Sequence, residues 1–264
     1  MDAEITKPEE LSLPQAFLLL ATNDKNGKPE VPVFALRTTL AGAILAELEL
    51  LGAVALEGKQ VRATGTAPKT EFQHVLELIR GKSRPHSPKR WVSMLEGRAE
   101  VQRVYEGMAT RGIVEHVGEK HLGLFKSVRY PEKDHGPEAA LLERVKAALS
   151  GTPPGPPTPV PPTPESEESG VKASDATPDS QAESVSDSKA PESMPDTKAP
   201  VVTVTDARTT ALIALLQAAG LLGKLFPAAD QSRASQLAKD YWPARAVEDE
   251  LRMIRLAEAE SPTL

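Results

Sequence analysis

Apolar residues return at helical spacing along most of the chain, except in its middle. Over about residues 35–51 a leucine or isoleucine recurs every three or four positions, which predicts a long helix ending near Gly52. The same periodicity and helix-start signals predict further helices around residues 12–21, 70–79, 87–95, 98–111, 138–149, 206–219, 231–240 and 243–259. Helices therefore account for most of the expected structure.

Two short stretches have the pattern of β-hairpins instead. Residues 54–56 and 60–62 flank the turn Glu57-Gly58-Lys59, and Ile113–His116 with Leu122–Val128 are expected to form a second hairpin. The predicted fold class is thus mainly α, a compact multi-helix domain with two short β-hairpins.

The middle of the chain has a different composition. Residues 151–200 hold half of the 24 prolines, and their nine acids and three lysines account for the whole net charge of −6. Such a stretch buries too little apolar surface to offset its ordering entropy, so residues 151–204 are predicted to be a disordered linker. Because about 60 residues make a marginal core alone, residues 205–264 are expected to complete the same domain as residues 1–150.

Composition excludes several classes of protein. The absence of cysteine excludes disulfides, thiolate metal sites and a cysteine nucleophile. The first four residues are acidic where a secretory signal would be basic, and the most apolar run, 33–56, carries three charges. The motifs GxxxxGK[ST], GxGxxG and GxSxG do not occur. We therefore expect a non-enzymatic, cofactor-free cytoplasmic protein, peripheral on the cytoplasmic face of a membrane if it is attached to one.

Several stretches, taken in order and spacing, resemble the Golgi phosphoprotein family of lipid-binding adaptors and their bacterial relatives. They are Leu11–Pro14 with Phe17–Leu20, Leu40–Leu48 with Leu51-Gly52, Arg111–Val114, Leu122–Phe125 with Arg129–Pro131, and Ala211–Leu216 before Ala219-Gly220. The resemblance covers most of residues 11–149 and 206–258. It implies a mainly helical fold and a peripheral membrane adaptor, located at the Golgi if the organism is a eukaryote.

The resemblance also implies a ligand, phosphatidylinositol 4-phosphate, bound through a tryptophan and several basic residues. Of the family's four positions, Arg98 keeps a basic residue, whereas Pro32, Ala41 and Val101 stand at the other three. Arg37 precedes Ala41 by four residues and therefore shares a helix face with it. Its guanidinium can reach the same phosphate with two parallel hydrogen bonds.

Residues 80–91 form the most basic window, with five bases, one histidine and no acid. A loop before a helix N-terminus suits a phosphate because the amides there add partial positive charge, and each base near an anionic membrane contributes about 1 kcal/mol. The predicted headgroup-binding residues are Arg37, Arg84, Lys89, Arg90 and Arg98. The alternative for this window is a solvated loop with Trp91 in the core.

Residues 121–130 alternate apolar and basic side chains. In the eukaryotic relatives the matching hairpin inserts into the membrane or bridges subunits. We therefore predict membrane insertion by Leu124 and Phe125, with Lys126 and Arg129 at the headgroups, and homo-oligomer contact through this hairpin. The alternative is that its apolar residues fold onto the helices.

Other kinds of partner remain open. The helix at 98–111 followed by a hairpin resembles the end of a winged helix, yet the part expected to fold has no net positive charge, which disfavours nucleic-acid binding. A protein-interaction scaffold without a lipid role is the further alternative, and the sequence identifies no protein partner. His116 and His121, near Glu115 and Glu119, match no metal-ligand spacing, so no metal is predicted.

Overall fold

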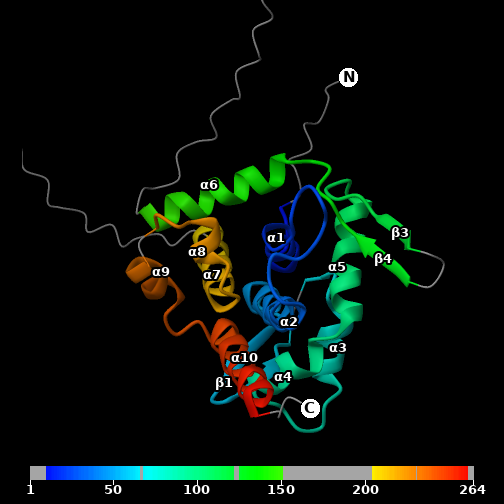
Figure 1. Ribbon diagram of the computed structural model, residues 1–264. Coiled ribbons are helices and arrows are strands. Elements are labelled where there is room, and N and C mark those ends of the chain that lie inside the picture. Colours follow the sequence, from blue (N-terminus) through cyan, green and yellow to red (C-terminus); the bar gives the residue numbers. More distant parts are fainter. Residues whose placement is uncertain (1–9, 66–67, 122–124, 151–203, 230, 261–264) are drawn as a thin grey trace, which may run out of the picture. The chain divides into compact units, whose positions relative to one another are not determined.

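The computed structural model describes residues 10–65, 68–121, 125–150, 204–229 and 231–260 (Figure 1). Helices dominate this part of the chain, which confirms the predicted mainly α fold with two small antiparallel sheets. The helices are α1 (Leu13–Leu20), α2 (Val33–Leu50), α3 (Gln73–Arg80), α4 (Pro88–Leu95), α5 (Arg98–Thr110), α6 (Gly136–Ser150), α7 (Val204–Ala218), α8 (Leu222–Leu225), α9 (Gln231–Ala238) and α10 (Trp242–Glu260). The strands are β1 (Val54–Glu57), β2 (Gln60–Ala63), β3 (Val117–His121) and β4 (Phe125–Arg129).

Helix α2 is the centre of the packing. From Ala35 to Leu48 nearly all of its side chains are buried, and α1, α4, α5, α7 and α10 all contact it. A helix that is apolar on every side is buried on every side. Its Gly42 allows α10 to approach closely, because a Cβ atom there would lie 2.2 Å from Cγ2 of Val247.

The described residues on the two sides of 151–203 belong to one compact unit. A buried ion pair joins them: Arg208 of α7 donates from Nη1 and Nη2 to the Glu47 carboxylate of α2, at 2.6 and 3.0 Å. The same carboxylate accepts from the Leu13 amide at 2.7 Å, so it also fixes the start of α1. The predicted disordered linker, 151–204, lies outside the described residues except for Val204, where α7 begins.

The two tryptophans lie on opposite sides of residues 151–203 in the sequence. Trp91 of α4 is fully buried in the core. Trp242, the first residue of α10, is half-buried and donates its ring N–H to the Glu49 carboxylate of α2.

The hairpin β1–β2 is confirmed, with Val54 opposite Ala63 and Glu57 opposite Gln60. The second predicted hairpin is wrong in its first arm, which is Val117–His121 and not Ile113–His116. Ile113 and Val114 are apolar because they are buried in the core, and Val114 forms an isolated bridge with Glu132. Helix α7 begins two residues earlier than predicted, and the short helix α8 was not predicted.

Candidate functional site

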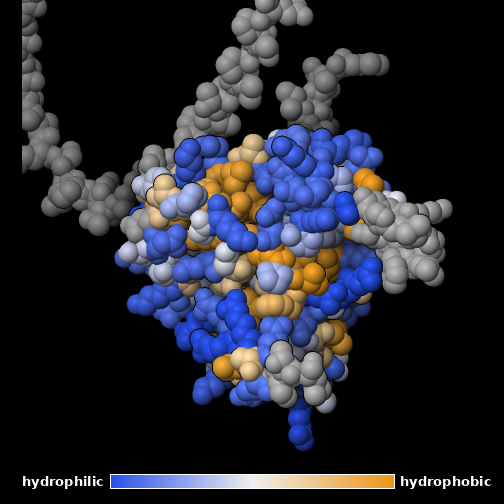
Figure 2. Space-filling view, viewed as in Figure 1, coloured by the Kyte–Doolittle hydropathy of each residue, from blue (hydrophilic) through white to orange (hydrophobic). Residues whose placement is uncertain are grey.

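A cavity of about 250 Å³ opens between the first turns of α2 and α5. The turn that follows α1 forms one wall and the end of β4 forms another. The residues that line the cavity are Gly27, Pro29, Val33, Leu36, Arg37, Arg98, Val101, Gln102, Tyr105, Val128 and Tyr130. On the face shown in Figure 2, hydrophobic surface lies between the regions of α2 and α5 and is bordered by hydrophilic residues.

The two basic residues of the cavity come from different helices. Arg37 is half-buried in the second turn of α2, and Arg98 is exposed as the first residue of α5. None of the described residues that line the cavity is acidic. The cavity therefore presents positive charge from two sides, which suits a phosphate or another anion.

Two stacked tyrosines form an aromatic wall. The rings of Tyr105 and Tyr130 lie parallel, with centroids 4.3 Å apart, and the Tyr105 hydroxyl is hydrogen-bonded to Thr22 Oγ1 at 2.6 Å. Burial raises the pKa of Tyr105 to about 12. Burial and then the charge of Glu106 raise the pKa of Tyr130, while the charge of Arg98 opposes this shift. Both phenols are neutral at physiological pH and leave the arginine charges uncompensated.

The turn from Asn23 to Pro29 is held by its own backbone. Asn23 donates to the Lys28 carbonyl, and Gly27 donates to the Asn23 carbonyl, both at 2.8 Å. Gly27 has φ +62°, and a Cβ atom there would lie 2.5 Å from the backbone nitrogen of Tyr130. Only glycine fits this close approach, which fixes one wall of the cavity.

Sequence comparison identifies the family. The family model described as Golgi phosphoprotein 3 (GPP34) matches residues 13–254, nearly the whole chain. The chain belongs to the Golgi phosphoprotein 3 family. Comparison with curated proteins gives no significant match.

Two of the four positions that the family resemblance connects with the headgroup line the cavity. These are Arg98 and Val101, whereas Ala41 is fully buried in the core and Pro32 is exposed just before α2. Arg37, one turn before Ala41, is the α2 residue that brings a guanidinium into the cavity. The structure thus brings together two of the five predicted headgroup residues.

The other three predicted headgroup residues lie elsewhere. Arg84 is exposed in the loop between α3 and α4, and Arg90 is exposed in the first turn of α4. Lys89 Nζ lies 3.9 Å from the Glu250 carboxylate of α10. Ser87 caps α4 by accepting from the Arg90 amide at 3.3 Å. None of these three lysine and arginine residues lines the cavity between α2 and α5.

The predicted insertion residues fall at the edge of what the structure describes. Leu124 and the side chain of Phe125 lie outside the described residues. Sequence reasoning missed two other apolar residues, Val33 and Val128, which are 51% and 39% exposed and line the cavity. Their signal in the sequence is weak, because an isolated valine at the end of a helix or strand is ordinary.

Of the residues weighed as metal ligands, His116 stacks on Tyr130 with ring centroids 5.2 Å apart. The side chains of Glu119 and His121 lie outside the described residues. Within the described part of the chain, no helix is both long and apolar enough to cross a membrane.

Proposed function

We propose that the protein is a peripheral membrane adaptor that binds an anionic phospholipid headgroup in the cavity between α2 and α5. The observation that carries the proposal is the convergence of Arg37 and Arg98 on one cavity. Among the described residues its lining includes no acid, and it has exposed valines at Val33 and Val128. The arginines bind the phosphate, and the valines contact the lipid chains nearest the headgroup. Membership of the Golgi phosphoprotein 3 family supports the same class of ligand.

Phosphatidylinositol 4-phosphate is the proposed headgroup, because two guanidinium groups on different helices suit an exposed phosphomonoester better than a buried phosphodiester. Each arginine can form charge-assisted hydrogen bonds that contribute about 1.5–3 kcal/mol. The loss of one arginine should therefore weaken binding roughly tenfold or more.

Vesicle co-sedimentation tests this proposal. Neutral vesicles, vesicles with phosphatidylserine, and vesicles with a few per cent phosphatidylinositol 4-phosphate are compared at low and physiological salt. We expect selective retention on the phosphoinositide vesicles that persists at physiological salt. Retention on every anionic vesicle that disappears with salt would indicate screened surface attraction without a headgroup site.

Matched variants locate the site. Arg37→Ala with Arg98→Ala should abolish retention without lowering the melting temperature. Arg103→Ala is the control, because Arg103 also lies on α5 but is exposed outside the cavity and pairs with Glu100 at 3.6 Å. Unchanged retention in the double variant would refute the cavity as the site.

The basic window, residues 80–91, is tested in parallel. Charge reversal in Lys89→Glu with Arg90→Glu should leave phosphoinositide selectivity intact and reduce only the salt-sensitive part of binding. If this charge-reversed variant abolishes retention and the variant at Arg37 and Arg98 does not, the headgroup site lies at the basic window and the proposed cavity is wrong. If the protein binds none of the vesicles, the lipid role itself is refuted, and an interaction scaffold is favoured.

A further inference from the structure

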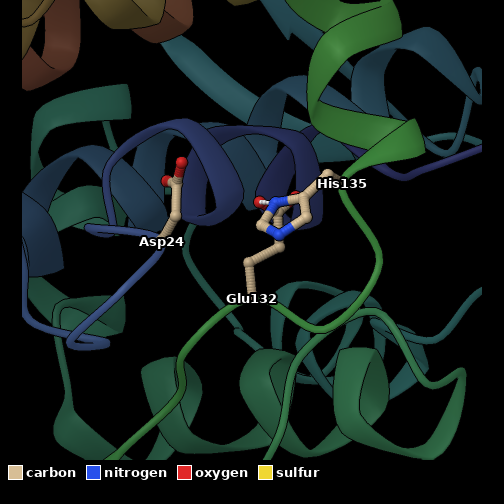
Figure 3. Close-up of side chains that lie close together, drawn as sticks. All are labelled: Asp24, Glu132 and His135. Atoms are coloured by element: carbon tan, nitrogen blue, oxygen red, sulfur yellow. Dashed lines mark hydrogen bonds and ion pairs between the residues drawn. The ribbon is translucent and has the colours of Figure 1, made fainter.

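A cluster of metal-ligating side chains lies beside the cavity. Asp24, in the turn after α1, and Glu132 and His135, in the loop from β4 to α6, each offer a ligand atom, and these atoms lie within 4.8 Å of one another. Figure 3 shows Glu132 and His135 on one segment and Asp24 on the neighbouring one. The backbone sets this arrangement, since the Glu132 amide donates to the Asp24 carbonyl at 3.0 Å.

Glu132 is the residue that points to a ligand. Its side chain is only 3% exposed, and its Oε1 atom is buried without a hydrogen-bond partner among the described residues. Its Oε2 atom contacts His135 Nδ1. A buried carboxylate oxygen without a hydrogen-bond partner is costly. Asp24 supplies no donor in its ionised form, and Glu138 supplies one only while it is protonated. A cation would satisfy the carboxylate oxygens of all three acids when they are ionised.

We propose that Asp24, Glu132 and His135 bind a divalent transition-metal ion such as Mn²⁺ or Zn²⁺. Two carboxylate oxygens and one imidazole nitrogen form a donor set that these ions accept. Mg²⁺ and Ca²⁺ prefer ligands that are all oxygen. Asp24 is exposed and His135 is 71% exposed, which leaves coordination positions open to water. Glu138, in the first turn of α6, lies within hydrogen-bond range of both acids and offers a further oxygen.

The ion would join two walls of the headgroup cavity. Asp24 lies in the same turn as Gly27 and Pro29, and Glu132 follows Tyr130 closely in the chain. Coordination would lock these segments together and hold the cavity in shape. The metal proposal does not depend on the lipid proposal, because binding of the ion is measured without vesicles.

The test uses the full chain after dialysis against EDTA. Mn²⁺ is titrated and followed by electron paramagnetic resonance, with Zn²⁺ as competitor and Mg²⁺ and Ca²⁺ as comparison ions. We expect one Mn²⁺ per chain, displaced by Zn²⁺, and a rise in the melting temperature, because the ion binds the folded state. Binding of Mg²⁺ or Ca²⁺ as tight as that of Mn²⁺ would refute the transition-metal assignment.

Three variants decide whether the cluster is the site. His135→Ala should weaken Mn²⁺ binding at least roughly tenfold, and Glu132→Gln should weaken it further. His116→Ala is the matched control, an exposed histidine that stacks on Tyr130 outside the cluster. If Glu132→Gln fails to fold, the exposed His135 position decides alone. Absence of stoichiometric binding, or binding that both variants leave unchanged, overturns the proposal and means that the ions bind adventitiously at the surface.

Discussion

The contact between α2 and α10 depends on Gly42. A Cβ atom at this position would lie 2.2 Å from Cγ2 of Val247 and 3.4 Å from the Pro243 carbonyl oxygen. Gly42→Ala must therefore displace Val247 or move α10. This perturbation tests directly how the residues after 203 pack on those before 151.

Two opposing effects set the magnitude. Alanine is favoured over glycine in a helix interior by about 1 kcal/mol. Overpacking a core costs about 1–3 kcal/mol, and the upper end applies because α10 is anchored along α2. We expect Gly42→Ala to lower the free energy of unfolding by about 1–2 kcal/mol, the difference of these effects.

The partner variant makes the test specific. Val247 is fully buried, so Val247→Ala should cost about 2 kcal/mol through lost burial and a cavity. In the double variant the new methyl group enters the space that Val247 leaves. The double variant should therefore be about 1–2 kcal/mol more stable than the sum of the single effects.

Urea denaturation followed by circular dichroism measures these free energies. Gly107→Ala is the matched control: Gly107 lies inside α5, and a Cβ atom there would make only an ordinary contact, 3.6 Å from Gln15 Nε2. This control should be as stable as the parent or more stable. Gly42→Ala that behaves like the control, or a double variant with additive effects, would refute the close packing of α10 on α2.

Three other substitutions have expected outcomes. Burial, with its carboxylate neighbours, raises the pKa of Glu138 to about 8 from 4.5. The unfolded chain therefore ionises Glu138 at lower pH than the folded protein does, so stability is highest below about pH 4.5 and falls as the pH rises through 8. In EDTA, Glu138→Gln should reduce this fall in melting temperature, and a pH profile identical to that of the parent would contradict the prediction. Arg208→Met leaves the buried Glu47 carboxylate without its cationic partner and should cost about 3–5 kcal/mol in urea denaturation, whereas a loss below about 1 kcal/mol would show that the pair contributes little. Gly27→Ala should lower the melting temperature more than Gly58→Ala, because both have φ near +60° but nothing lies within 4 Å of a Cβ atom at Gly58; equal effects would exclude the steric contribution.

Local pattern was enough to predict most helices. The long helix was predicted from leucine spacing, and helical periodicity alone placed Arg37 and Ala41 on the same face of it. That α5 lies across the start of α2 and brings Arg98 to Arg37 is a tertiary relation between residues 61 positions apart, which periodicity does not contain. The sequence therefore supplied both arginines as candidates but not their convergence.

The errors have physical causes as well. Ile113 and Val114 have the apolar character of a strand, but their burial in the core produces it. The true strand Val117–His121 lacks a clear alternation. The metal cluster was missed because Asp24 and Glu132 are far apart in sequence, and backbone hydrogen bonding between two irregular segments brings them together. Such segments have no periodicity from which a prediction can start.

The placement of the two tryptophans gives the protein a pair of intrinsic optical probes. Trp91 precedes the segment 151–203 and is fully buried, whereas Trp242 follows it and donates a hydrogen bond to the Glu49 carboxylate. The chain has two tryptophans, so replacing either one with phenylalanine leaves the other as the sole source of tryptophan emission. Fluorescence can therefore report separately on the polypeptide before and after residues 151–203 as it denatures, with no label attached.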